Sequence, residues 1–411
     1  MADLRWTGAA VAVAQVDTFT PGGTIEADDI FILTITGWDG TSTAVSAAAG
    51  GSTPTDVVTA LKTAWNDSTH PLCTPITASG TATLILTADT AGEAFSVAGT
   101  TTEAGGGGAD DQTFGKASTV ASAGPKHWDS LNNWDTGALP GAGDTIYIEN
   151  ATTEIIYGLD QSSAGAVTAL NIGQSFTGKL GYESAAGFNG TYLQITASTI
   201  NIGYNETTGN PSGSSRIMID NGATAVVVNI NGSGNSLDST KQAIRVKGSS
   251  ITSLNINKGS IGVAQNAGET ATITTLNINY ITSKTSDANV VIGSGVTLTT
   301  VNKVGGYCFL KCAATTINHD GGTLTTSGSG AITTINNDGG DLISNSSGTI
   351  TTLNNISGSA DFTKSRTART VTTVKMGSGA SLSFDDAVMA FTNEIAAYDT
   401  TGNIRFTSSR F

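Results

Sequence analysis

Three stretches in the C-terminal half decide the fold, ATTINHDGG (314–322), ITTINNDGG (332–340) and ITTLNN (350–355). Each contains an aliphatic residue followed by Asn, and the aliphatic residues of successive stretches lie 18 residues apart. A unit that recurs about every 20 residues is the signature of a solenoid, in which each unit stacks on the one before it.

The same unit recurs towards both ends of the chain. Spacings between its aliphatic anchor residues are 22, 25, 16, 18, 18 and 21 residues. We expect these anchors to face the solenoid interior. They are Leu254, Leu276, Val301, Ile317, Ile335, Leu353 and Val374. Degenerate copies precede them in VTALNIG (167–173), STINIG (198–203) and VVVNING (226–232).

Each unit has a second half with its own inward Leu or Phe. It is visible in GGTLTTSG (321–328), GGDLISNSSG (339–348) and GASLSF (379–384). One rung is therefore a strand, a Gly turn, a second strand and a Gly/Ser turn. An aliphatic residue every six positions, typical of left-handed hexapeptide helices, is missing. The sequence predicts a mainly β protein with a right-handed or flattened β-solenoid over residues 166–395 and a C-terminal segment over 396–411.

Two sets of polar residues repeat in phase with the anchors. Stacked rungs would superimpose Asn318, Asn336 and Asn354, whose amides could then bond along the stack. Asp320 and Asp338 would stack likewise. Stacked carboxylates repel one another unless they are solvated or bridged by a cation. We expect solvated turn residues, with a calcium site as the alternative, because turn oxygens suit that ion.

The charge and the apolar content of the chain argue against nucleic-acid-binding and membrane-spanning proteins. Only 13% of the residues are charged, 38% are hydrophobic, and the net charge is −14. Residues 1–125 contain 13 Asp/Glu and 3 Lys/Arg, whereas residues 126–411 contain 20 and 16. An acidic surface repels phosphate backbones, so we expect no nucleic-acid partner. No apolar stretch approaches the length of a membrane span. The opening MADLRWTGAAVAVAQVD does not look like a signal peptide, because its apolar run is short and interrupted.

Residues 1–104 are predicted to form a small α+β domain. FILTITG (31–37) and TLILTA (83–88) alternate as strands do. Between them, Thr53 can cap a helix that has Pro54 in its first turn. This helix is expected to bury an apolar stripe that includes Trp65, as a core anchor rather than as a ligand platform. The stripe consists of Val57, Leu61, Ala64 and Trp65.

A Gly-rich linker (105–123) and a cap segment (124–165) are predicted to separate this domain from the repeats. The linker contains GGGGADD (105–111), which we interpret as a flexible joint because no Lys-Ser/Thr follows the glycines as in a phosphate loop. In the cap segment, Trp128 and Trp134 could cover the bare apolar end of the first rung. Stacking on a carbohydrate is the alternative role for these rings.

No residue constellation in the sequence indicates catalysis. Cys308 and Cys312 share a strand face, and we interpret them as buried thiols rather than as a zinc site with His319. The other histidines, His70 and His127, lie far from them in sequence. The acidic residues of the repeats do not recur at the same position of the unit, apart from Asp320 and Asp338. They are Asp220, Asp238, Glu269, Asp287, Asp320, Asp338, Asp341 and Asp361. We therefore predict a protein without catalytic residues, cofactor or metal.

Several stretches together resemble a group of bacteriophage and prophage proteins with an α+β N-terminal module and a β-helical body. The resemblance covers nearly the whole chain and is strongest in residues 1–205. It is carried by RWTGAAVAVAQVDTFTP (5–21), TLILTADTAGEAFSV (83–97), NWDTGALPGAGDTIYIEN (133–150), IIYGLDQS (155–162), LNIGQSFTGKLGY (170–182) and STINIGY (198–204).

This resemblance implies a virion structural protein, made in the host cytoplasm, on the capsid surface or in the tail. We expect a capsid decoration protein whose N-terminal domain contacts other virion proteins. A homo-oligomer is expected, with a host-surface glycan as a further candidate partner. The alternatives are a tail or tail-fibre component and a secreted bacterial β-helix adhesin or polysaccharide-processing protein.

Overall fold

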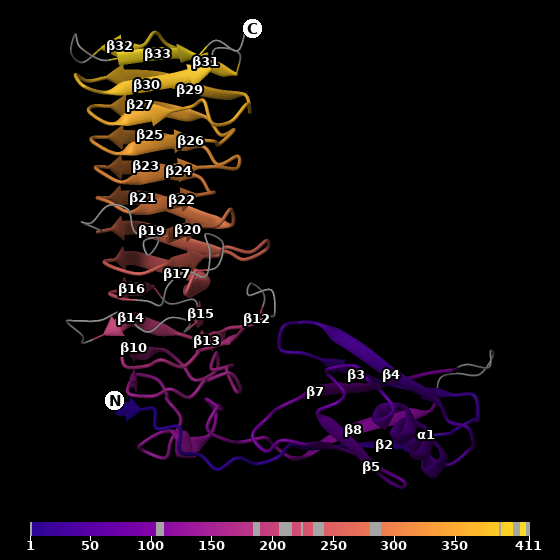
Figure 1. The fold of residues 1–411 in the computed structure, drawn as a ribbon. Coiled ribbons are helices and arrows are strands. Elements are labelled where there is room, and N and C mark those ends of the chain that lie inside the picture. Colours follow the sequence, from indigo (N-terminus) through magenta and orange to yellow (C-terminus); the bar gives the residue numbers. More distant parts are fainter. Residues whose placement is uncertain are drawn as a thin grey trace.

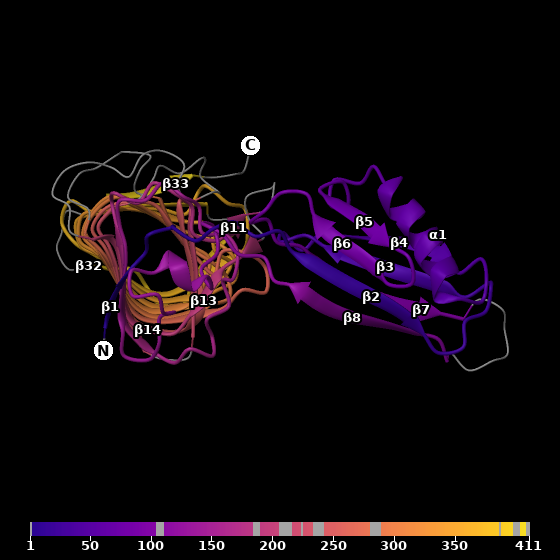
Figure 2. The same ribbon diagram turned by 90° about the horizontal axis from the view of Figure 1, so that it is seen from below.

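The structure is a computed structural model that describes residues 2–103, 111–183, 190–204, 216–222, 225–232, 242–279, 289–385, 388–397 and 403–407. Stacked parallel strands form a long rod, and a smaller α+β domain projects from one end of it (Figure 1). Seen along the rod, the domain lies beside the solenoid rather than beneath it (Figure 2). The predicted combination of a β-solenoid with a small α+β domain is confirmed.

The anchor residues predicted from the repeats lie in the first of two strand stacks. These strands pair in parallel and in register, so that Leu276 lies between Leu254 and Val301. Leu254, Leu276 and Ile317 are fully buried, as are Ile335 and Leu353. The stack consists of β10 (Val167–Gly173), β14 (Ala197–Tyr204), β16 (Val226–Ile230), β17 (Ile244–Ile256), β19 (Ala271–Ile278), β21 (Val296–Lys303), β23 (Ala314–His319), β25 (Ile332–Asn337), β27 (Ile350–Asn355) and β29 (Arg369–Met376).

The second stack contains the predicted second half of each rung. Its strands also pair in parallel, for example Leu324 with Leu342. Strand β17 contributes to both stacks, because its first residues pair with β18 and its last residues with β19. The other members are β13 (Leu193–Ile195), β15 (Ile217–Asn221), β18 (Ile261–Val263), β20 (Asn289–Ile292), β22 (Tyr307–Leu310), β24 (Thr323–Thr326), β26 (Asp341–Ser344), β28 (Ser359–Asp361) and β30 (Ser381–Asp385).

Both ends of the stack extend beyond the predicted limits of 166 and 395. At the start, β9 (Thr145–Ile148) pairs in parallel with β10, and β1 (Asp3–Arg5) pairs with β9. At the other end, β33 (Asn403–Thr407) pairs with β30, so the described part of the predicted segment 396–411 belongs to the stack. Between them lie β31 (Met389–Phe391) and β32 (Ala396–Ala397), which both pair with β29. The added strands are short and show little periodicity in the sequence. The solenoid was therefore predicted to be shorter than it is.

Three tryptophans close the lower end of the rod. Trp6, Trp128 and Trp134 are at most 4% exposed and belong to the solenoid core. The rings of Trp128 and Trp134 lie 4.9 Å apart, and Trp134 lies 5.2 Å from Trp6. The short 3-10 helix η1 (Leu131–Asn133) leads into Trp134. Because Trp128 and Trp134 are covered by protein, they offer no surface on which a sugar could stack.

The α+β domain has its own hydrophobic core, separate from that of the solenoid. Two antiparallel sheets, in the orders β5-β6-β2-β8 and β4-β3-β7, enclose it with helix α1. Thr53 and Asp56 form a capping box at the helix start, and Trp65 is 1% exposed, as predicted for a core anchor. The elements are β2 (Val16–Gly22), β3 (Ile30–Thr36), β4 (Ser42–Ala48), α1 (Pro54–Asn66), β5 (Ile76–Gly80), β6 (Leu84–Ala88), β7 (Ser96–Thr102) and β8 (Thr113–Val120).

The predicted boundaries of this domain need correction at both ends. Strand β8 falls in the predicted linker 105–123 but pairs with β2 along its whole length. Lys116 of β8 lies 2.9 Å from the carboxylate of the buried Asp17. Most of GGGGADD lies outside the described residues, but it joins β7 to β8 within one domain and is not the joint to the solenoid. The domain therefore covers residues 16–120 and is inserted between β1 and the cap.

A column of asparagine side chains runs along the rod. Asn318, Asn336 and Asn354 are stacked and hydrogen-bonded as predicted, and the column continues far below them. Each Nδ2 donates to Oδ1 of the Asn one rung nearer the cap, at 2.7–2.9 Å. The members are Asn171, Asn201, Asn229, Asn255, Asn277, Asn302, Asn318, Asn336 and Asn354.

Candidate functional site: the cleft between domain and solenoid

Two chain segments connect the α+β domain to the solenoid, and they run side by side. Val13 and Ala123 form an antiparallel bridge between them. The fully buried Asn133 of the cap joins both segments, because its Nδ2 donates to the carbonyl of Gly124 at 2.8 Å and its Oδ1 accepts from the amide of Ala10 at 2.8 Å. The domain is thus held to the base of the rod by hydrogen bonds as well as by the chain.

Next to these connections, the domain and the first rungs enclose three adjoining cavities of about 220, 290 and 470 Å³. Trp38 borders the first and the third, while Tyr157 and Tyr182 border the first and the second. Because they share walls, we treat the cavities as one site, the junction cleft. The lining residues used below are Trp38, Asp39, Glu93, Tyr157, Tyr182, Tyr192, Lys247, Asn266 and Glu269.

Trp38 lies at the centre of the junction cleft, just after β3. It is half-buried, and its Nε1 donates to the carbonyl of Ala94 at 3.2 Å. Its ring lies 5.6 Å from that of Tyr157 in an edge-to-face arrangement. Its carbonyl accepts a hydrogen bond of 3.0 Å from Oγ1 of Thr191, in the short hairpin of β11 (Tyr182–Glu183) and β12 (Gly190–Thr191). Trp38 therefore has a fixed position between the two parts of the molecule.

The solenoid wall of the cleft is built around Tyr192. Its hydroxyl donates to Glu269 at 2.9 Å, and the ammonium of Lys247 lies 4.4 Å from the centre of its ring. Burial, with the nearby carboxylate of Glu269, raises the pKa of Tyr192 well above its usual value. Burial also raises the pKa of Tyr157 to about 12. Both phenols therefore remain neutral hydrogen-bonding groups at all physiological pH values.

Most charged groups in and around the cleft are paired with one another, and among the described lining residues the carboxylates of Asp39 and Glu93 have no ion pair. Lys247 lies 3.5 Å from Asp220, and the buried Arg245 lies 3.8 Å from Glu269. Glu183 lies 2.6 Å from the buried Arg216. Such pairs neutralise much of the local charge, and their burial makes the loss of one partner costly.

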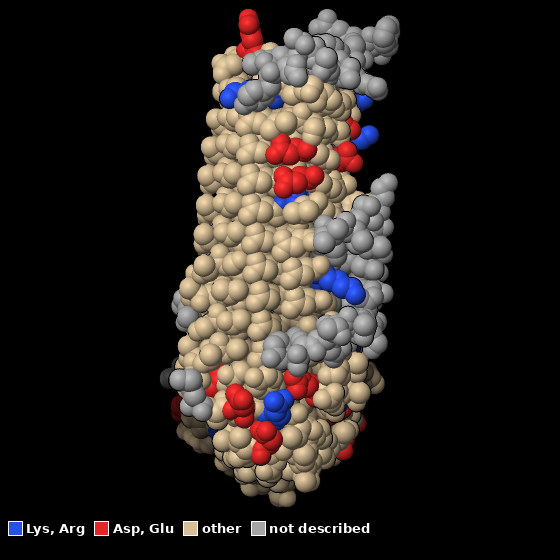
Figure 3. All heavy atoms as spheres, turned by 90° about the vertical axis from the view of Figure 1, so that its left-hand side faces the viewer, with Lys and Arg blue, Asp and Glu red and all other residues tan. Residues whose placement is uncertain are grey.

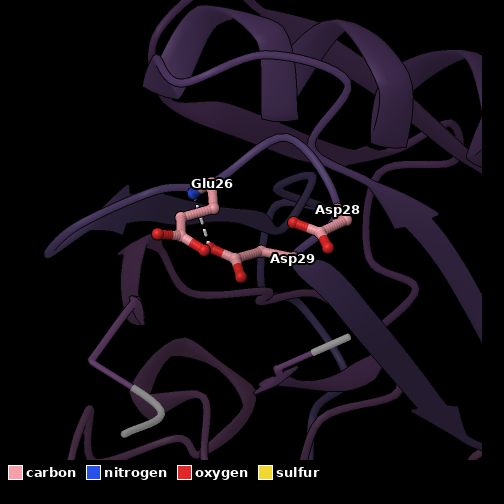
Figure 4. Close-up of side chains that lie close together, drawn as sticks. All are labelled: Glu26, Asp28 and Asp29. Atoms are coloured by element: carbon pink, nitrogen blue, oxygen red, sulfur yellow. Dashed lines mark hydrogen bonds between the residues drawn. The ribbon is translucent and has the colours of Figure 1, made fainter. Parts of the chain in front are cut away.

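A separate group of three carboxylates lies in the α+β domain, between β2 and β3. Glu26, Asp28 and Asp29 face one another, with ligand oxygens within 4.8 Å (Figure 4). Asp29 is fully buried, and its Oδ2 accepts from the amide of Glu26 at 2.7 Å. These three acids are not among the candidate residues predicted from the sequence. Glu26 and Asp28 are exposed, and exposed acidic groups of this kind are common without an ion, so the geometry alone assigns no metal.

The residues considered for a zinc site prove to be core residues. Cys308 and Cys312 are at most 4% exposed and form no disulfide. Burial raises the pKa of each thiol to about 12, which keeps both protonated. His319 is fully buried, and neither ring nitrogen has a hydrogen bond of good geometry, although the backbone of Asp341 is near. Among the described residues, these three do not form a ligand cluster.

The acidic pair considered for calcium lies on the outer surface. Asp320 and Asp338 are both exposed at the turn after β23 and β25. Of the other acids in the repeats, Glu269 reaches the junction cleft, and Asp238 and Asp287 lie outside the described residues.

Sequence reasoning missed the junction cleft because its lining comes from unconnected segments. Trp38 follows a domain strand, Tyr157 lies in the cap, and Tyr192 and Glu269 lie in different rungs. The one usable signal was Trp38 in TGWDG (36–40), a large aromatic residue in a turn sequence where no core position is expected.

No helix among the described residues has the length and apolarity needed to cross a membrane. No protein-family model, curated protein or solved structure matches the chain.

Proposed function

We propose that the protein is a non-enzymatic structural protein of a bacteriophage virion, most consistent with a capsid decoration protein. The solenoid acts as a rigid rod, and the α+β domain attaches it to the particle. The observation that best supports a rigid structural role is the asparagine column, because its hydrogen bonds connect successive rungs over most of the rod. Side-chain columns of this kind are typical of stacked β structures of high stability.

The outer surface supports a passive role for the rod. One face is almost without charged side chains over its middle part (Figure 3). Thr side chains also follow one another at matched positions of successive rungs, for example Thr316, Thr334 and Thr352. A hydroxyl-rich surface with few charges offers few sites for nonspecific charge-driven binding.

The charge of the α+β domain supports its role in attachment. Residues 16–120 contain 12 Asp/Glu and 2 Lys/Arg, a net charge of −10 out of the −14 of the whole chain. An acidic domain of this kind is suited to a basic protein surface, through complementary charge. Its place at the base of the rod leaves the upper rungs free to project (Figure 1).

The first test is a mass-spectrometric census of purified particles of the phage that encodes the protein, with copy number per particle. A decoration protein is expected in many copies with the capsid, whereas a tail-fibre component, the second candidate, would be present in few. Absence from the particles would contradict both and favour a secreted adhesin.

The second test separates the two parts where the structure divides them. One variant replaces residues 14–122 with Asn-Gly, a turn that suits the antiparallel bridge between Val13 and Ala123. The other consists of residues 13–123 alone. We expect the domain to bind particles that lack the protein and the rod not to bind. The opposite result would contradict attachment through the domain.

A further inference from the structure

We infer that the junction cleft binds a neutral oligosaccharide. This inference goes beyond the proposed function and does not depend on it, because it concerns the chemistry of the cleft rather than the place of the protein on a particle. It rests on the shape of the cleft, on its aromatic side chains and on the pairing of its charges.

The shape of the cleft suits a chain of sugar rings. The cavity of about 220 Å³ shares Trp38 with one neighbour and Tyr157 and Tyr182 with the other, and the largest of the three measures about 470 Å³. This lies in the range of sites that bury small organic ligands. An extended ligand can therefore occupy consecutive cavities.

Trp38 and Tyr182 are the partly exposed aromatic residues of the cleft, whereas Tyr157 and Tyr192 are buried in its walls. Trp38 is the one tryptophan of the chain that is not buried, whereas Trp6, Trp65, Trp128 and Trp134 are at most 4% exposed. A tryptophan whose Nε1 is already bonded to the protein, as here to Ala94, presents its apolar ring to a ligand.

Polar side chains beside the rings can bond to sugar hydroxyls. Asp39 is held by hydrogen bonds from Thr41, which lower its pKa and keep it an ionised acceptor. Asn266 is fixed by Glu269, since its backbone amide and its Nδ2 each lie 3.0 Å from that carboxylate. Carboxylate and amide groups in fixed positions are suited to vicinal hydroxyls, which both donate and accept.

The charges of the cleft disfavour a charged ligand, because Asp39 and Glu93 repel an anion and the other charged groups are already paired. Lys247 is paired with Asp220, and Glu269 with Tyr192 and Arg245. A charged ligand would have to compete with these existing pairs, and an uncompensated charge in a partly buried site is costly. A neutral sugar leaves them intact.

Trp38 provides a direct test. Acrylamide quenching of tryptophan fluorescence in the full-length protein reports mainly on Trp38, because the other four rings are covered. The probes are maltotriose, cellotriose and triacetylchitotriose. At least one is expected to reduce quenching in a saturable manner, and calorimetry with the same sugar gives its Kd.

Variants locate the binding. Trp38→Ala and Tyr192→Phe are each expected to weaken Kd about tenfold, which corresponds to about 1.4 kcal/mol. Tyr307→Phe is the matched control, because Tyr307 is a half-buried solenoid tyrosine that borders none of the three cavities, and its Kd should be unchanged. Unchanged melting temperatures confirm that the variants fold.

Three results would overturn the inference. In the first, none of the three sugars binds. In the second, binding is unaffected by Trp38→Ala in a folded protein. In the third, only charged oligosaccharides or peptides protect Trp38 from the quencher.

Discussion

The lower and the upper rungs of the solenoid differ at one equivalent inward position, two residues after the anchor. In the lower rungs this position is apolar, with Ile172, Ile202, Ile230, Ile256 and Ile278. In the four rungs above them it is polar but equally buried, with Lys303, His319, Asn337 and Asn355, and in the next rung it is apolar again, with Met376.

The turns that follow explain this difference. In the four rungs with a polar residue only three residues separate the two strands of a rung, as in 320–322 between β23 and β24, whereas four separate β29 from β30 in the rung of Met376. Such tight turns bring backbone carbonyls over the core, and buried carbonyls need donors. Asn337 donates to the carbonyl of Ser359 at 3.0 Å, Asn355 to that of Ser381 at 2.8 Å, and Lys303 to that of Gly321 at 2.6 Å.

The glycines of these turns make room for the polar side chains. A Cβ at Gly340 would lie 2.1 Å from Nε2 of His319, and one at Gly358 would lie 2.4 Å from Nδ2 of Asn337. The lower rungs use longer connections, for example ten residues between β19 and β20. The length of the turn therefore decides whether the inward side chain is apolar or a hydrogen-bond donor.

The largest loss of stability is expected when an apolar residue and a polar residue are exchanged at this inward position. Ile278→Asn replaces a fully buried aliphatic side chain with an amide in a rung whose equivalent inward neighbour, Ile256, is also apolar. We expect a loss of about 4 kcal/mol of unfolding free energy. The reverse change, Asn337→Leu, should cost only about 1–3 kcal/mol, mainly because the carbonyl of Ser359 loses its donor. Urea denaturation measures both, and equal losses would contradict the proposed role of the turns.

Lowering the pH should weaken the upper rungs through His319. Burial lowers its pKa from 6.5 to about 4. Between these values the unfolded chain binds a proton that the folded chain does not, so stability falls as the pH falls from 6.5 to 4. The shift corresponds to about 3 kcal/mol at most. His319→Asn, which introduces the residue found in the next two rungs, should remove this dependence.

The measurement is the urea midpoint of wild type and His319→Asn at several pH values. The difference between the two proteins should change between pH 6.5 and 4 and remain constant above pH 7.5. Parallel curves throughout would show that His319 does not titrate with a lowered pKa.

Interruption of the asparagine column should have a smaller effect. Asn277→Ala removes two hydrogen bonds of a half-buried ladder, and we expect a loss of about 1–2 kcal/mol. Asn257→Ala is the matched control, because Asn257 also makes two such bonds, to Asn231 and Asn279, but is exposed. Its loss should be about 0.5 kcal/mol, since water replaces the lost partners. Denaturant midpoints of the two variants compare them directly.

The smallest effect is expected at the outer turns. Asp320→Asn combined with Asp338→Asn should leave the melting temperature unchanged or slightly higher, because two stacked like charges are removed. A chelator should not alter the melting temperature of the wild type. A marked decrease with chelator would instead indicate a bound cation at this pair.

Periodic features were predictable from the sequence, and features that depend on distant partners were not. The anchors, the Asn318 stack and helix α1 each follow from a local pattern. Strand β8 was assigned to a linker because it follows a Gly-rich run and, being almost entirely exposed, has no apolar face. The role of Trp6 in the cap could not be seen, since its partners Trp128 and Trp134 are more than 120 residues away. The same holds for the junction cleft.

The insertion of the α+β domain bears on the order in which the chain folds. β1 is synthesised before the α+β domain, whereas the strand that pairs with it follows that domain. The amide of Ala2 bonds to Asp144, 142 residues further on. The entropy lost in closing a loop grows with its length. Domains fold as units during synthesis, and folding of residues 16–120 brings Val13 and Ala123 together. The folded domain thus shortens the loop that must close between β1 and β9. It also keeps β1 close to the place where β9 emerges from the ribosome.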